Sequence, residues 1–161
     1  MNAVRAQEPL ELPVVLFVDD DARNRQAFHA AFRHNMIVLL AADRDQALQL
    51  LSAGNVHVMI ADQRMPGTTG SELLTLVRER FPAVRRMLVT GYADLEAIID
   101  AVNNGGVTKY FAKPWVHDQL VKAVNEAHAE AKAEADRAQY TKQIEVANQQ
   151  LEFALRQRLL S

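Results

Sequence analysis

The sequence of 161 residues contains no cysteine. Disulfide frameworks, thiol nucleophiles and zinc–thiolate sites are therefore excluded, and the composition is compatible with a reducing compartment. No apolar run approaches the roughly 18 residues that a membrane-spanning helix needs. The first residues, MNAVRAQEPLELP, also lack the apolar core of a signal peptide. We therefore expect a cytoplasmic protein that does not contact the membrane.

A strong excess of one charge is missing as well. The chain has 18 basic and 20 acidic side chains and a formal net charge of -2, which gives no reason to expect nucleic-acid binding by this segment. Glycine and proline are absent from residues 117–161, where alanine and charged residues dominate. We therefore expect three parts, which are a flexible leader over residues 1–12, a folded domain over 13–128 and a helical extension over 129–161.

Short apolar segments alternate with amphipathic segments along the folded part. The apolar segments predict buried strands at residues 14–18, 36–41, 56–61, 84–89 and 107–112. Helices are expected between them, with Asp21, Asp43 and Asp94 as N-caps, and a last helix is expected to begin near His117. Strands that alternate with helices predict an α/β fold, in which helices cover both faces of a doubly wound, five-stranded parallel sheet.

Polar side chains follow several of the predicted strands. Asp19 and Asp20 end the first strand and Asp62 ends the third, while Thr90 and Lys113 follow the fourth and fifth. Each alone has an ordinary explanation as a turn, cap or surface residue. Because the carboxyl ends of parallel strands meet at one edge of a sheet, we expect these side chains to converge there.

Clustered carboxylates repel one another unless a cation lies between them, and oxygen ligands suit Mg²⁺. A lysine beside them supplies a point charge for a phosphoryl oxygen or for a carboxylate. An ionised aspartate in such a site can act as a nucleophile on phosphorus and form an aspartyl phosphate. The cluster therefore indicates phosphoryl chemistry with Mg²⁺ as the cofactor.

Four segments, FVDDD, ADQRMPGTTG, LVTGYAD and YFAKPW, together resemble the receiver domain of two-component response regulators over residues 14–127. The resemblance implies a flavodoxin-like sheet with strand order 2-1-3-4-5, followed by a long C-terminal helix. It also implies a phosphorylation switch that receives its phosphoryl group from a histidine kinase or a phosphotransfer protein. The protein would not be an enzyme beyond self-phosphorylation and autodephosphorylation.

The resemblance assigns roles to single residues of the acidic cluster. Asp62 would be the phosphoacceptor. Asp20 would bind Mg²⁺ directly and Asp19 mainly through water, with Asp62 and the backbone carbonyl of Arg64 as further ligands.

The resemblance also assigns roles on the last two strands. Thr90 would be the switch hydroxyl, and Tyr110 would be the aromatic that swings inward when Thr90 engages the phosphoryl group. Lys113 would contact the phosphoryl group, and the Lys113–Pro114 peptide would be cis. For Trp115, where the last helix begins, we expect a packing role.

The motifs TGYAD and KPW occur in a narrower group than the family as a whole. They resemble the receivers of hydrogenase-regulating activators and of HD-type phosphodiesterases. Those proteins carry a large output domain, so this chain is expected to be either a fragment or a receiver whose tail is the output. In the tail, an apolar seam through Tyr140, Ile144, Ala147, Leu151 and either Ala154 or Leu155 predicts a coiled coil. A homodimer through this helix or through the receiver face is expected, and an amphipathic helix folded back on the domain is the alternative.

Two other functions remain open at this stage. The pattern Asp19-x-Asp21 superficially resembles the nucleophile motif of haloacid-dehalogenase-type phosphohydrolases, but that family would leave the Asp62 motif unexplained. A degenerate receiver would act only as a protein-binding or dimerisation module. The complete set of acidic residues, Thr90 and Lys113 argues against such degeneracy, although not against an output from the unphosphorylated state.

Overall fold

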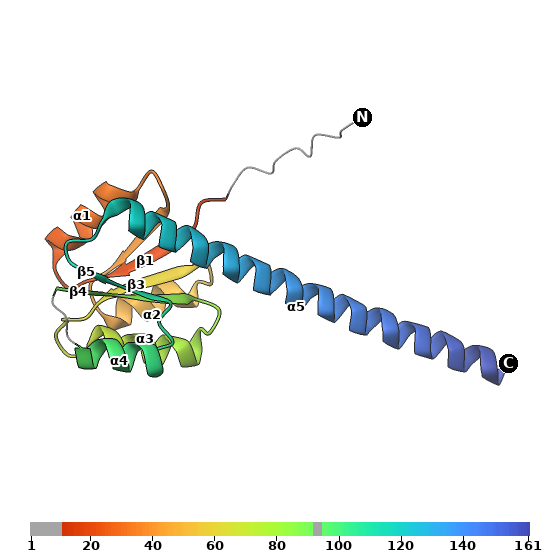
Figure 1. Ribbon diagram of the computed structural model, residues 1–161. Helices are drawn as coiled ribbons and strands as arrows, with labels where there is room; N and C mark the ends of the chain where they lie inside the picture. The colour runs from red at the N-terminus through yellow and green to blue at the C-terminus, as the bar shows by residue number, and fades with distance from the viewer. Residues whose placement is uncertain (1–10, 92–94) are drawn as a thin grey trace, which may run out of the picture. The chain divides into compact units, whose positions relative to one another are not determined.

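The computed structural model describes residues 11–91 and 95–161, and most of its elements are labelled in Figure 1. Strands and helices alternate in the order β1 (Val14–Val18), α1 (Ala22–Phe32), β2 (Ile37–Ala41), α2 (Arg44–Ser52), β3 (Val58–Asp62), α3 (Gly70–Arg80), β4 (Arg85–Thr90), α4 (Leu95–Asn103), β5 (Lys109–Ala112) and α5 (His117–Leu160). The strands form one parallel sheet in the order β2-β1-β3-β4-β5. The predicted fold class and strand order are therefore confirmed.

The element boundaries differ slightly from the predicted ones. The first strand is exact, whereas β3 extends to Asp62 and β5 begins only at Lys109. The late start of β5 has a local cause, because Gly106 turns the chain with φ +59° and the Val107 N–H still donates to the Ala101 carbonyl of α4. The segment before Lys109 is thus used to end the preceding helix rather than to begin the strand.

Side chains at the helix starts satisfy backbone N–H groups that have no partner within the helix. Asp21 accepts from the Arg23 N–H, and Asp43 accepts from the Gln46 N–H, as predicted. The predicted cap at Asp94 lies outside the described residues. Thr69 caps α3 by accepting from the Glu72 N–H, and the sequence analysis had missed it.

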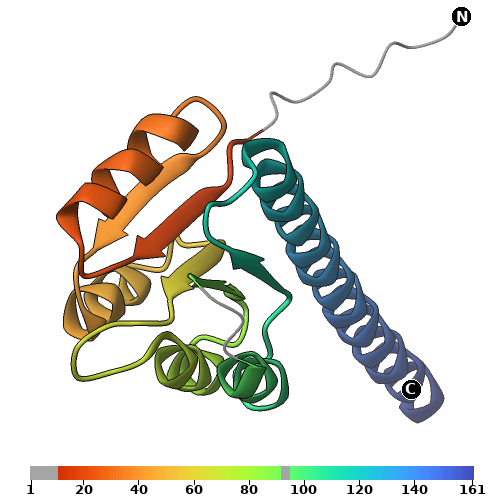
Figure 2. The ribbon, with the colours of Figure 1, turned by 60° about the vertical axis from the view of Figure 1, so that its left-hand side comes forward.

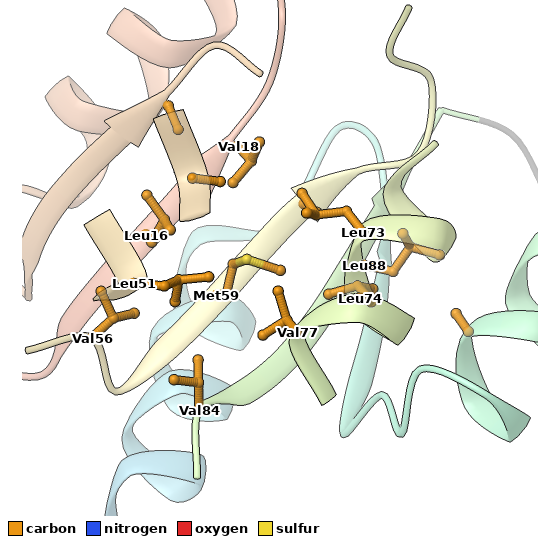
Figure 3. Close-up of a cluster of buried hydrophobic side chains, with 14 residues drawn as sticks. Leu16, Val18, Leu51, Val56, Met59, Leu73, Leu74, Val77, Val84 and Leu88 are labelled. Atoms are coloured by element: carbon orange, nitrogen blue, oxygen red, sulfur yellow. The ribbon is translucent and has the colours of Figure 1, made fainter. Parts of the chain in front are cut away.

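Alternate residues of each strand point to opposite faces of the sheet, and each face has its own hydrophobic core. Leu16 and Val18 contribute to the core against α2, α3 and α4, which is drawn in Figure 3. Met59 of β3 lies in this core between Leu51 of α2 and Val77 of α3 (Figure 3). Figure 2 shows α1 on the opposite face of the sheet.

The second core lies against α1 and the first turns of α5. It contains Phe17 of β1 and the α1 residues Phe28 and Phe32, with Leu120 and Val124 of α5 as their cover. The Trp115 ring meets the rings of Phe17 and Phe28 nearly at right angles, with centroid distances of 6.0 and 5.7 Å. Such edge-to-face pairs contribute about 0.5–1.5 kcal/mol each. The predicted packing role of Trp115 is confirmed.

The amino edge of the sheet contains a buried cation that the pattern of β4 does not reveal. The Arg86 side chain donates to the carbonyl oxygens of Gly105 at 2.7 Å and Val84 at 2.8 Å, and to those of Pro82 and Gly106 at 3.4 Å. Burial lowers the pKa of Arg86, and the nearby charges of Arg78 and Arg85 lower it further. The guanidinium nevertheless stays protonated, because arginine is effectively always charged. It therefore joins β4 to the end of α4 by charge-assisted hydrogen bonds.

The long C-terminal helix is confirmed as one continuous element, α5. The chain divides into two compact units, one ending at His128 and the other formed by Ala129–Ser161. Tyr140, Ile144 and Leu151 of the second unit are about 60–67% exposed. None of the helices within residues 11–91 and 95–161 combines the length and the apolarity that crossing a membrane requires.

Candidate functional site

The strand order brings the polar strand ends together at the carboxyl edge of the sheet. Val18 of β1 lies beside Ala61 of β3, which places Asp19 next to Asp62 along the two chains. Thr90 ends β4, where it pairs with Ala112, and Lys113 follows directly. Because β3 lies between β1 and β4, Asp62 is central in this arrangement.

Lys113 connects two of the buried carboxylates. Its Nζ lies 2.9 Å from Asp62 Oδ1 and 3.6 Å from Asp19 Oδ2. The lysine side chain is 27% exposed, whereas the Asp62 side chain is only 8% exposed. The cation therefore approaches from the open side of the site and partly neutralises two anions that burial has removed from water. The Lys113–Pro114 peptide that follows is cis.

The environment of Asp62 changes its acidity in opposing ways. Burial raises the pKa of this carboxyl above its ordinary value of 3.8. The hydrogen bond and positive charge of Lys113 lower the pKa, while the negative charges of Asp19 and Asp20 raise it again. The net direction is upward, so the ionised form is less favoured than in a free carboxyl group.

The acidic cluster has the donor set for a hard divalent cation. One carboxylate oxygen from each of Asp19, Asp20 and Asp62 lies within 4.8 Å of the others. Asp20 is exposed, whereas Asp19 and Asp62 are buried, so the cluster opens to solvent on one side. Oxygen ligands in such an arrangement fit Mg²⁺, which keeps several waters and accepts phosphate oxygens. The residues present therefore fit the cofactor that the sequence indicated.

Asp19 is held in place by neighbours that sequence reasoning missed. Its Oδ1 accepts from the Asp21 N–H at 2.9 Å, and its Oδ2 accepts from Asn24 Nδ2 at 3.1 Å. Arg25 donates from Nη1 to the Asp19 carbonyl oxygen at 2.8 Å. The signal for these contacts was available, since the first turn of a helix that begins just after Asp21 places Asn24 near the preceding strand end.

The remaining predicted site residues occupy different environments. Thr90 is buried at the end of β4. Tyr110 is 53% exposed on β5, which is an outward position. Arg64 follows Gln63 at the start of the loop between β3 and α3, and its side chain is exposed. The roles of these three residues stay predictions.

Open α/β sheets bind ligands at the carboxyl ends of their strands, where this domain has an acidic cluster and a lysine, and the comparisons with known proteins identify the family. The family model described as "Response regulator receiver domain" matches residues 15–125. The chain belongs to this family, whose members work in phosphorylation-based signalling.

Among curated proteins, the chain is similar to the hydrogenase transcriptional regulatory protein HoxA of Cupriavidus necator, with 43% identity over 113 residues. That match covers 70% of this chain and 23% of HoxA. The C4-dicarboxylate transport transcriptional regulatory protein DctD of Rhizobium meliloti is 32% identical, over 71% of this chain and 25% of DctD. The chain thus spans about a quarter of the length of these relatives.

Among solved structures, the receiver domain of an HD domain-containing protein from Pseudomonas fluorescens is similar, with a TM-score of 0.76 and 29% identity. The alignment covers 83% of this chain and 99% of that one. A receiver domain protein from Clostridium thermocellum gives a TM-score of 0.71 at 26% identity, over 76% and 98% of the two chains. The fold and the family assignment therefore agree.

Proposed function

We propose that this chain is a phosphorylation-dependent switch in which Asp62 accepts a phosphoryl group from a histidine kinase or a phosphotransfer protein. The observation that carries this proposal is the position of Asp62 Oδ1, buried at the centre of the carboxyl edge and 2.9 Å from Lys113 Nζ. Asp19 and Asp20 lie beside it with one oxygen each within 4.8 Å. This arrangement supports the proposed roles of Asp62 as the nucleophile, of Lys113 as the neutralising cation and of the three aspartates as metal ligands.

The transfer itself needs little covalent chemistry from the protein. An Asp62 oxygen attacks phosphorus, the new O–P bond forms, and the P–N bond of the donor phosphohistidine breaks with its electron pair left on the imidazole nitrogen. Lys113 then moves its contact from the free carboxylate to a phosphoryl oxygen. Asp19, Asp20, Asp62 and the Arg64 carbonyl would hold Mg²⁺, which when bound supplies positive charge for the phosphoryl oxygens.

The signal is proposed to leave the site through α4, β5 and α5. The aspartyl phosphate adds close to two negative charges. The Thr90 hydroxyl, at the end of the neighbouring strand, then contacts the phosphoryl group. Tyr110 then leaves its outward position, and the surface around it repacks. Ile99, Val102 and Tyr110, from α4 and β5, are each about half exposed, so this surface offers apolar contacts to a partner.

The second unit is proposed to pair with a second copy of the chain. Its apolar seam, Tyr140, Ile144, Ala147, Leu151 and Ala154, is flanked by the uncharged residues Thr141, Gln143, Asn148, Gln150 and Gln157. Identical helices in a parallel pair bring such flanking positions together, and like charges there would repel. We expect Ile144→Lys to convert a dimer to a monomer in light scattering after size exclusion. A monomeric parent protein would contradict this part of the proposal.

Intact-mass spectrometry after incubation with acetyl phosphate tests the central proposal. We expect a single phosphoryl adduct that requires Mg²⁺, is absent in Asp62→Asn and persists in Asp45→Asn, which changes an exposed carboxylate of α2. An adduct of full extent in Asp62→Asn would show that another residue is the acceptor. A folded parent protein that takes no phosphoryl group from acetyl phosphate or from a phosphohistidine donor would favour a binding module that does not use phosphorylation.

A further inference from the structure

The loop between β3 and α3, residues 64–69, is flanked by Gln63 on one side and by Gly70 and Ser71 on the other, and Gln63 is hydrogen-bonded to both. Gly70 N–H donates to the Gln63 carbonyl oxygen at 3.0 Å. Ser71 N–H donates to Gln63 Oε1 at 2.9 Å, and Gln63 Nε2 lies 3.3 Å from Ser71 Oγ. The loop that follows the acceptor is therefore closed at its base by three contacts, all of which involve Gln63.

This loop base is buried. Gln63 and Ser71 are 8% and 5% exposed, and the Gln63 N–H donates to the Val89 carbonyl of β4 at 2.9 Å. Gln63 thus uses its backbone N–H, its carbonyl and both polar atoms of its side chain. A buried N–H that loses its acceptor costs about 1–3 kcal/mol, so the Ser71 N–H favours the present position of the Gln63 amide strongly.

The same contacts reach the acceptor through the backbone. Gly70 lies so close to Asp62 that a Cβ there would overlap the Asp62 carbonyl oxygen and lie 2.9 Å from Gln63 Cα. The start of α3 therefore packs directly on the peptide that carries the acceptor carboxylate. A shift of the loop base would move Asp62 and the following Arg64 together.

Gln63 shares the capping of α3 with Thr69, because the Gly70 and Ser71 N–H groups that donate to it belong to the first turn of this helix. Thr69 already caps α3 by accepting from the Glu72 N–H at 3.3 Å, and its hydroxyl also lies 3.3 Å from Ser71 Oγ. Gln63, the residue after Asp62, is thereby connected through Ser71 to the capping residue Thr69 in one network of polar contacts.

We propose that Gln63 is a positioning residue for phosphoryl transfer, whose buried amide closes the base of the 64–69 loop and so holds the Asp62 carboxylate and the Arg64 carbonyl in reacting geometry. This inference rests on the proposed function. Small misplacements of reacting groups reduce rates strongly, which makes the effect of losing this amide measurable.

The test uses the full chain with Gln63→Met, which keeps the side-chain length and removes both amide contacts. Thr75→Val is the matched control, because the Thr75 hydroxyl donates to the Ser71 carbonyl oxygen at 3.0 Å within α3 and does not touch Gln63. We expect the rate of labelling by acetyl phosphate at saturating Mg²⁺ to fall about tenfold in Gln63→Met. We expect it to stay within twofold in Thr75→Val. Ser71→Ala removes the 3.3 Å contacts of the Ser71 hydroxyl with Gln63 Nε2 and Thr69 Oγ1 but keeps the Ser71 N–H bond to Gln63 Oε1, so it is expected to give a smaller loss.

Two further measurements separate positioning from general destabilisation. In Gln63→Met we expect faster amide hydrogen exchange across residues 64–69 and weaker Mg²⁺ binding. We expect neither change in Thr75→Val when the two variants are compared at equal free energy of unfolding. Labelling, exchange and Mg²⁺ binding equal to those of the parent would overturn the proposal. If the parent protein takes no phosphoryl group, the proposed function fails, and exchange and Mg²⁺ binding still decide the role of Gln63. If Gln63→Met does not fold, Ser71→Ala decides it by the same readouts.

Discussion

The two edges of the sheet each bury a charged side chain, and they compensate it in opposite ways. At the carboxyl edge, Asp62 faces Lys113, a flexible side chain that remains 27% exposed. At the amino edge, Arg86 donates only to backbone carbonyls at the start of β4 and the end of α4. Burial shifts both pKa values toward the neutral form, upward for Asp62 and downward for Arg86.

The difference separates a working site from a structural one. Lys113 can leave the Asp62 carboxylate and contact another anion, because it is a point charge on a mobile stem. The carbonyls around Arg86 belong to the backbone and cannot rotate away as a lysine side chain can. The partner of Asp62, Lys113, is therefore replaceable at the edge where chemistry is proposed. The partners of Arg86, backbone carbonyls, are fixed at the edge where β4 is joined to the end of α4.

Removing the replaceable partner should give the largest effect. Lys113→Met leaves Asp62 buried without its cation, and we expect labelling by acetyl phosphate to slow about 100-fold, the usual cost of one lost donor to a developing charge. Lys109→Met is the control at the start of β5, the strand that Lys113 follows, where the side chain is exposed. Initial labelling rates by intact mass measure the effect. Equal slowing in both variants would mean that general charge, rather than the contact at 2.9 Å, is responsible.

Removing Arg86, the buried charge whose partners are fixed, should affect stability instead of chemistry. Arg86→Met leaves buried carbonyls without donors, and we expect the free energy of unfolding to fall by about 3 kcal/mol, with labelling of Asp62 preserved. Urea denaturation checks the first expectation and intact mass the second. Arg80→Met, on the exposed side of α3, should change stability little. An Arg86→Met protein that is as stable as the parent but takes no phosphoryl group would contradict the structural role of Arg86 and indicate a role in the chemistry.

The smallest expected effect concerns the cost of keeping Asp62 ionised. Because its pKa is raised in the folded state, Asp62 contributes stability fully below its ordinary pKa of 3.8 and loses that contribution as pH rises through the folded pKa. Without Mg²⁺, Asp62→Asn should therefore be more stable than the parent at pH 7, with a gain that vanishes near pH 4. Denaturation curves across this range measure the gain. A gain that is equally large at pH 4 would point to packing rather than charge.

Much of this architecture was predictable because it depends on local patterns. Short apolar runs ended by aspartate, threonine or lysine identify the strands and place their ends at one edge. That edge brings Asp19, Asp62 and Lys113 together, as expected from the strand order. Boundaries were less certain, as at Val107, where a helix end continues into a segment of strand-forming residues.

The polar contacts between distant elements were not predictable from such patterns. Gln63 and Arg86 follow or interrupt apolar runs, and nothing in their neighbourhood shows which backbone groups they will meet. Arg86 bonds to Gly105 across the α4 helix, and Gln63 bonds to Ser71 across a loop. Such contacts depend on the packed arrangement of elements rather than on the period of a single segment.

The position of α5 in the second core has a consequence for how the protein is made. Phe17, Phe28 and Phe32 lie early in the chain, whereas their cover, Leu120 and Val124, lies at the end of the domain. On a ribosome these aromatic rings are synthesised long before the residues that cover them. The nascent chain therefore exposes hydrophobic surface until the start of α5 has emerged. The beginning of α5 is thus the last part of this core to be synthesised, and the aromatic rings lack this cover until it emerges.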